Sequence, residues 1–225
     1  PDNVPYFIDA FYKKGQNYPK NSFELDNPFI LRNSKGVNIT FLPIQYNGST
    51  KEIIVITELI VKIKTTSLSS RISTKLFNDK KRFDPDFINI FKNNYANYES
   101  LIKNYAEIQP EKFINERTRV LIISHEKFVE TLNPLIQWKR EMGFNVKLAT
   151  LAETGVVYTS IKDYIQKDYD ENNTSYVILV GDAEFVPYYE GTAGNAKGNE
   201  ADPMYSLTAG NDNYPDLFVS RLSVK

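Results

Sequence analysis

The chain has 225 residues, 41% of them hydrophobic and 24% charged, and its formal net charge at pH 7 is −1. This balance argues against a nucleic-acid-binding protein, which needs clustered positive charge. No apolar run reaches the roughly 18 residues of a membrane span. Cysteine is absent and His125 is the single histidine, so a cysteine nucleophile is excluded and a complete catalytic triad is disfavoured within these residues. Pro1 stands where a methionine would begin a primary product, so a processed or trimmed chain is expected.

Residues 1–64 are predicted to form an antiparallel, sandwich-like β domain. A short apolar run at 27–33 ends in a turn sequence, and residues 37–42 alternate with the period of two that is typical of a half-buried strand. Asn47 and Gly48 suit a hairpin turn because both tolerate positive φ angles. The β-branched segment 52–63 is expected to return as one long strand.

Residues 65–113 are predicted to form a helical linker. Asp84 and Pro85 suit the cap and first position of a helix. Apolar side chains follow at helical spacing, at Phe87, Ile90, Phe91, Tyr95 and Tyr98. We interpret them as a packing stripe rather than a binding site.

Residues 114–225 alternate between strand and helix patterns. A helix with Pro134 in its first turn and Gly143 as a left-handed C-cap is expected, followed by a second helix capped by Thr159. The predicted strands are 119–124, 145–150, 176–182 and 216–221. Strands separated by helices of this length form right-handed crossovers, so the sequence predicts a parallel α/β sheet.

One predicted strand ends in a glycine and a carboxylate. Residues 175–182 are an apolar, β-branched run that closes with Gly181 and Asp182. Ligands of open α/β sheets bind beyond the carboxyl ends of the strands, so Asp182 is expected at the functional edge. His125 follows another strand and is interpreted as a loop or cap histidine. The glycine-rich loop after Asp182 precedes no helix pattern, so no nucleotide site is expected.

Acidic residues accumulate between the last two predicted strands. Asp182 closes one strand and Asp216 opens the other, with Asp202, Asp212 and Asn213 between them. If the strands are neighbours, the two carboxylates are expected to approach at one sheet edge and to bind calcium, which takes six to eight oxygen ligands. The alternative is that these residues serve in turns and caps. A carboxylate pair for acid–base hydrolysis lacks a substrate groove.

Several segments carry a family resemblance. The Trp-Lys helix, the Val-Gly-Asp strand end and the Asp-Leu-Phe-Val-Ser-Arg-Leu strand are specific as an ordered set. The matching segments of the second half are 120–123, 135–139, 142–146, 161–165, 176–182, 202–205 and 210–222. They resemble the amino-terminal part of the gingipain family of cysteine peptidases (peptidase family C25), with Ser220 where the family usually has glycine. Residues 28–32, 35–36 and 43–47 are similar to the propeptide of this family.

The resemblance implies a caspase-like catalytic domain of two subdomains, secreted or at the cell surface, stabilised by calcium and preceded by a β-rich prodomain. The catalytic histidine and cysteine of the family lie after the position of Leu222, so no catalytic residue is assigned here. Asp182 and Asp216 match positions that resemble the family's calcium ligands. The implied partners are the remaining catalytic subdomain or chain and a protein or peptide substrate.

The sequence therefore predicts the propeptide and first catalytic subdomain of a gingipain-like cysteine endopeptidase, inactive by itself. The alternative is a scaffold or sortase-like secretion component without general proteolytic activity. Two basic sites are noted. Lys225 suits cleavage by a trypsin-like activity, and the basic cluster 80–82 is either an inhibitory segment that fills the substrate pocket or a solvated linker.

Overall fold

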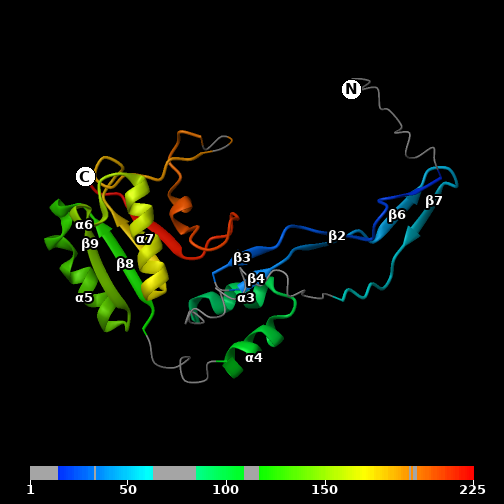
Figure 1. Cartoon of the computed structure of the whole chain (residues 1–225), viewed down its shortest axis with the longest axis horizontal. Coiled ribbons are helices and arrows are strands. Elements are labelled where there is room, and N and C mark those ends of the chain that lie inside the picture. The colour runs from blue at the N-terminus through cyan, green and yellow to red at the C-terminus, as the bar shows by residue number, and fades with distance from the viewer. Residues whose placement is uncertain (1–14, 33, 63–84, 109–116, 193, 195–196) are drawn as a thin grey trace. The chain divides into compact units, whose positions relative to one another are not determined.

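A computed structural model of the chain describes residues 15–32, 34–62, 85–108, 117–192, 194 and 197–225 (Figure 1). The described residues divide into two compact units, one formed by 15–28 and 37–62 and the other by 29–36 and 85–225. The short segment 29–36 thus belongs to a different unit from its neighbours in sequence. The predicted boundaries at residues 64 and 113 lie outside the described residues and stay predictions.

The first unit consists of short antiparallel strands. Its elements are β1 (Asn17–Tyr18), β2 (Phe23–Leu25), β5 (Ile39–Phe41), β6 (Ile44–Asn47) and β7 (Glu52–Val55). β1, β6 and β7 form a three-stranded sheet, and β2 pairs with β5. The predicted antiparallel β structure of this half is confirmed.

The hairpin between β6 and β7 is present, but its chemistry differs from the prediction. The Asn47 side-chain carbonyl accepts hydrogen bonds from the amides of Ser49 and Thr50 (3.1 and 3.2 Å). The residue with positive φ is Lys51, at 62°. Asn47 therefore closes the turn through its side chain rather than through a left-handed backbone.

The predicted long strand 52–63 is wrong in its extent. β7 ends at Val55, and residues 56–62 are irregular. The partner strand β6 has only four residues, and the ladder finishes with the bond from the Ile56 amide to the Pro43 carbonyl. Pro43 has no amide to donate, so pairing stops there despite the β-branched composition beyond.

The second unit is built on a parallel sheet in the order β11-β10-β8-β9. Its elements are β3 (Phe29–Leu31), β4 (Ser34–Gly36), η2 (Pro85–Phe87), α3 (Ile88–Asn94), α4 (Tyr98–Ile108), β8 (Arg119–Ser124), η3 (Glu126–Phe128), η4 (Glu130–Leu132), α5 (Asn133–Glu141), β9 (Asn145–Thr150), α6 (Leu151–Thr154), α7 (Tyr158–Asn172), β10 (Thr174–Val180), η6 (Asp202–Ser206) and β11 (Phe218–Leu222). The predicted α/β architecture with a parallel sheet is confirmed.

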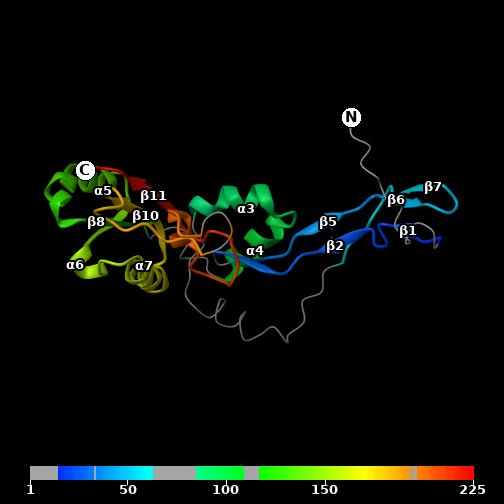
Figure 2. The same cartoon turned by 90° about the horizontal axis from the view of Figure 1, so that it is seen from above.

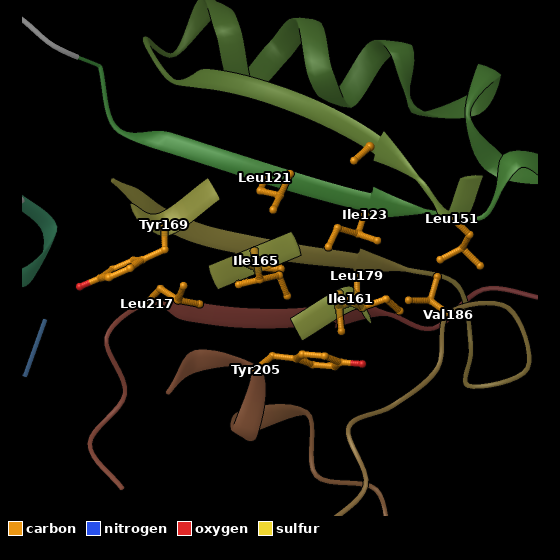
Figure 3. Close-up of a cluster of buried hydrophobic side chains, with 12 residues drawn as sticks. Leu121, Ile123, Leu151, Ile161, Ile165, Tyr169, Leu179, Val186, Tyr205 and Leu217 are labelled. Carbon is orange, nitrogen blue, oxygen red and sulfur yellow. The ribbon is translucent and has the colours of Figure 1, made fainter. Parts of the chain in front are cut away.

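Helices cover both faces of this sheet, with α5 on one side and α6 and α7 on the other (Figure 2). Side chains alternate along β8, so that Leu121 and Ile123 join the α7 cluster while Val120 and Ile122 join the α5 cluster. Ile161, Ile165 and Tyr169 of α7 lie in a row against the sheet in Figure 3. Burial of each such side chain contributes about 1.5–3 kcal/mol, which explains the near-continuous apolar strands.

The ends of the two longer helices test the capping predictions. Pro134 lies in the first turn of α5 and Gly143 follows it with φ of 97°, as predicted. Thr159 is not the cap of α7, because the helix begins at Tyr158 and its N-cap is Val157, without a side-chain bond. Among the described residues, no helix is long and apolar enough to cross a membrane.

The hairpin β3–β4 packs against α3. Phe29 and Leu31 form one buried cluster with Phe87 and Phe91, with Tyr95 packed against it. The aromatic stripe predicted for this region is therefore a packing surface. Asp84, its predicted cap, lies outside the described residues.

Candidate functional site

Asp182 and Asp216 lie at opposite ends of the sheet, so the expectation that they meet at one edge is wrong. β10 and β11 are parallel, with Tyr176 beside Phe218 and Val180 beside Leu222. Asp216 precedes its strand and is level with residue 174, whereas Asp182 follows β10. The separation is eight residues, or about 26 Å at roughly 3.3 Å per residue. Parallel neighbours bring together two starts or two ends, never one of each.

Asp216 is fully buried at the amino-terminal end of the sheet. Its Oδ1 accepts a hydrogen bond from the Arg32 amide (2.6 Å), and its Oδ2 accepts from the amides of Thr208 and Ala209 (2.8 and 2.5 Å). Burial raises the pKa of this carboxyl to about 6, against the opposing effect of the three amide donors. The side chain thereby connects the hairpin to the loop that precedes β11.

Arg32 is also fully buried, and its guanidinium fills a cage of neutral acceptors. One terminal nitrogen donates to the carbonyls of Thr174 and Asp216 (2.8 and 2.7 Å). The other donates to the Asn173 carbonyl and the Ser175 hydroxyl (2.9 and 3.0 Å). The rings of Phe87 and Tyr169 lie 5.0 and 5.3 Å from its central carbon, a cation–π distance. We call this cage, with Asp216, the Arg32 site.

Asp212 receives the same hairpin at a second point. Its Oδ2 accepts from the Ile30 amide (2.7 Å) and its Oδ1 from the Tyr214 amide (2.9 Å). Ile30 lies in β3 and Arg32 directly follows the strand, with a positive φ of 57°. The two aspartates, four residues apart in the loop, therefore hold the main chain of the hairpin at two points.

The loop before β11 is also tied to α7. The Lys162 ammonium donates to the carbonyls of Tyr205 and Leu207 (3.1 and 2.7 Å), and the Gln166 side chain donates to the Thr208 carbonyl (2.9 Å). Burial lowers the pKa of Lys162 to about 8. These bonds hold the backbone that presents Thr208 and Ala209 to Asp216.

Asp202 is the partner of Arg221 rather than a ligand candidate. The Arg221 guanidinium donates to both oxygens of Asp202 (2.7 and 2.9 Å) and to the carbonyls of Gly181 and Val186 (2.9 and 2.7 Å). This bidentate pair fastens the long loop after β10 to β11.

Asp182, at the carboxyl end of the sheet, is more exposed than Asp216. The Asp182 side chain is 37% exposed; its Oδ1 accepts from the Ala183 amide (2.9 Å) and its Oδ2 lies 3.9 Å from the Lys225 ammonium. His125 caps η3, because its Nδ1 accepts the Lys127 amide (3.1 Å), and its ring packs edge-on against Phe185. This matches the interpretation of His125 as a cap histidine.

The described residues contain no group of three or more histidine, cysteine or acidic side chains that could hold a metal ion. The basic cluster 80–82 lies outside the described residues. Sequence reasoning missed Arg32, although one signal was available: a charged residue directly after the apolar run 28–31 is costly to bury and implies dedicated partners.

Comparison with known proteins gives consistent matches to both halves. Residues 114–225 match the model of peptidase family C25, and residues 1–105 match the model of its propeptide. The chain is 29% identical over 227 residues to gingipain R2 of Porphyromonas gingivalis strain ATCC BAA-308 / W83, covering 99% of this chain and 29% of that protein. It is 25% identical over 236 residues to Lys-gingipain of strain ATCC 33277, covering 99% and 13%.

Solved structures give a partial match. The complex of Porphyromonas gingivalis RgpB pro- and mature domains is 24% identical, with a TM-score of 0.44, over 48% of this chain and 25% of that chain. The chain spans less than a third of the length of the curated relatives it matches.

Proposed function

The chain belongs to peptidase family C25, with the propeptide in residues 1–105 and the first part of the peptidase domain in residues 114–225, and we propose that the whole protein is a secreted or cell-surface cysteine endopeptidase made as a zymogen. Its substrates are proteins or peptides. A caspase-like catalytic domain of two subdomains is part of the same proposal.

The observation that carries this proposal is the hairpin β3–β4. It lies in the part of the chain that matches the propeptide, and it packs on the part that matches the peptidase. Arg32 and Ile30 bond to residues 141 to 184 positions away. A propeptide integrated so deeply into the peptidase fold suits a zymogen whose propeptide stays bound until processing.

The described residues do not contain a catalytic pair. The sequence has no cysteine, and His125 uses its Nδ1 as a cap acceptor. The thiolate nucleophile and its histidine would come from the remaining catalytic subdomain or chain. In this proposal, the sheet described here is the support on which that partner is placed.

Calcium stays a prediction, and the geometry favours only one of its two expected ligands. Asp216 is buried and accepts three amide hydrogen bonds, which an ion would have to displace. Asp182 is partly exposed at the carboxyl end of the sheet, and water can complete the oxygen ligands of a calcium ion. We therefore propose that, of these two aspartates, Asp182 is the calcium ligand and Asp216 is not.

Peptide hydrolysis by the whole protein tests the function. We expect it to be latent as synthesised, to become active after removal of residues 1–105, and to be blocked by iodoacetamide, which alkylates a thiolate. Absence of thiol-dependent hydrolysis in every processed form would favour the scaffold or sortase-like alternative.

Replacement of all three residues of the basic cluster 80–82 by alanine tests the inhibitory segment, because unchanged latency would exclude that role.

A further inference from the structure

We propose that the Arg32 site anchors the propeptide hairpin β3–β4 to the peptidase region. It keeps the hairpin bound there after the chain that joins the hairpin to the peptidase region is cut. The ligand of the cage is the guanidinium of Arg32 itself. This inference rests on the family assignment of the two regions and concerns binding only, so it stands or fails independently of peptide hydrolysis.

The first support is the geometry of the cage. Its acceptors are three backbone carbonyls and one hydroxyl, all between 2.7 and 3.0 Å from the two terminal nitrogens. The carbonyls belong to the C-cap of α7, the first residue of β10 and the approach to β11. Each is the kind of terminal backbone group that a helix or strand leaves without a partner within its own element.

The cage discriminates between the two long cationic side chains. A guanidinium presents donors in a fixed plane and can satisfy four acceptors at once, whereas an ammonium carries three donors on a single atom. Removal of the arginine leaves buried carbonyls without a donor, and each unsatisfied group is costly. The site therefore requires arginine and not simply a positive charge.

The second support is the backbone of the hairpin. Asp212 and Asp216 accept hydrogen bonds from the amide of Ile30 in β3 and from the amide of Arg32 directly after it, so two side chains of the loop before β11 bind the main chain of the hairpin. The Tyr169 hydroxyl donates to the Arg32 carbonyl (3.2 Å). Arg32 is therefore bound through both its main chain and its side chain.

The third support is an aromatic contact at the first residue of the hairpin. The Phe29 ring stacks on Tyr214 with centroids 3.9 Å apart and planes inclined by 18°. Gly36, paired with Phe29 across the hairpin, leaves room for this ring, since a Cβ at position 36 would overlap it. The hairpin is therefore held by three kinds of contact over eight residues.

The test separates the hairpin from the peptidase region by one cut. A protease recognition sequence is inserted between Glu58 and Leu59, which are exposed and lie in irregular backbone. Cleavage gives a fragment that contains the hairpin and a remainder that contains the Arg32 site. We expect the two wild-type fragments to co-elute in size-exclusion chromatography under native conditions.

Three variants of the cut chain decide the outcome. Arg32→Ala and Arg32→Lys are expected to raise the dissociation constant of the fragments at least tenfold. Lys35→Ala removes an exposed cation of the same hairpin and is expected to leave it unchanged. Co-elution of the Arg32→Ala fragments at the wild-type level, or equal loss with Lys35→Ala, would overturn the proposal.

Folding of the uncut variants is checked by circular dichroism and by amide exchange of the buried strand β8. If uncut Arg32→Ala lacks the native spectrum, Arg32→Lys decides in its place, because it preserves length and charge. Wild-type affinity of the Arg32→Lys fragments would then refute the requirement for a guanidinium.

Discussion

An aspartate lies at each end of the parallel sheet, and the two differ in burial and in hydrogen bonding. At the amino-terminal end, Asp216 is buried and saturated by amides, and Arg32 is enclosed by carbonyls. At the carboxyl end, Asp182 accepts one neighbouring amide and is partly exposed to solvent. The difference shows that Asp216 holds a distant chain segment, while Asp182 bonds to its own neighbour and is open to solvent. The same residue type, before one strand and after its neighbour, thus serves cohesion at Asp216 and stays partly exposed at Asp182.

The largest contrast is expected from removing each aspartate. Asp216→Ala leaves three amides without an acceptor, two of them buried and one partly buried, at about 1–3 kcal/mol for each buried one, so we expect a loss of several kcal/mol or failure to fold. Asp182→Ala is expected to cost less than about 0.5 kcal/mol, as for most exposed positions. Urea unfolding of both variants measures the difference. Equal losses would remove the distinction between the two ends.

A smaller loss is expected when the hairpin is overpacked. Gly36→Ala forces the Phe29 ring away from its place on Tyr214, and overpacking of this kind costs about 1–3 kcal/mol. Thermal unfolding and amide exchange across residues 29–36 report it. Lys35→Ala is the matched control, for which no change is expected. A Gly36→Ala chain as stable as wild type would show that the stacked position is dispensable.

The pH dependence sharpens the contrast further. The folded-state pKa of Asp216 is raised to about 6 by burial, so the folded protein holds this proton more tightly than the unfolded chain. Its contribution to stability is therefore fully present below about pH 4 and is lost as the pH rises to and through about 6. The difference in unfolding free energy between wild type and Asp216→Asn, measured from pH 4 to 7, should fall over this range. A difference that rises over the same range would contradict the sign.

Calcium is expected to give the smallest effect, confined to the carboxyl end. Millimolar calcium should raise the melting temperature of the wild type, and Asp182→Ala should abolish the rise, because ligand binding to the folded state stabilises it by mass action. Glu184→Ala, an acidic residue of the same loop, is the control and should respond as the wild type does. A wild-type melting temperature that is indifferent to both calcium and chelator would refute the site.

The sequence was sufficient for elements whose causes are local. The strands β8 and β10 follow from apolar runs, and the start and end of α5 follow from Pro134 and Gly143. The parallel sheet follows from the alternation of these strands with helices. In each case the chemistry that fixes the element lies within a few residues of it.

The candidate site could not be predicted from local sequence in this way. The partner of Asp216 is the amide of Arg32, 184 residues away, and no periodicity connects the two. The turn-or-cap alternative for the acidic loop residues was nearer the outcome, since Asp202, Asp212 and Asp216 all act as hydrogen-bond acceptors. The predicted length of β7 was wrong because a strand pairs only as far as its partner strand extends.

The sequence separation of the Arg32–Asp216 contact has a consequence for biosynthesis. At typical elongation rates of about 5–20 residues per second, 184 residues take roughly 10 to 40 seconds to translate. During that interval the hairpin carries Phe29, Ile30 and Leu31 without the loop that will accept it. Transiently exposed apolar surface of this kind makes a nascent chain prone to aggregation. Completion of the amino-terminal end of the sheet is then a late event, triggered when the residues around Asp216 emerge.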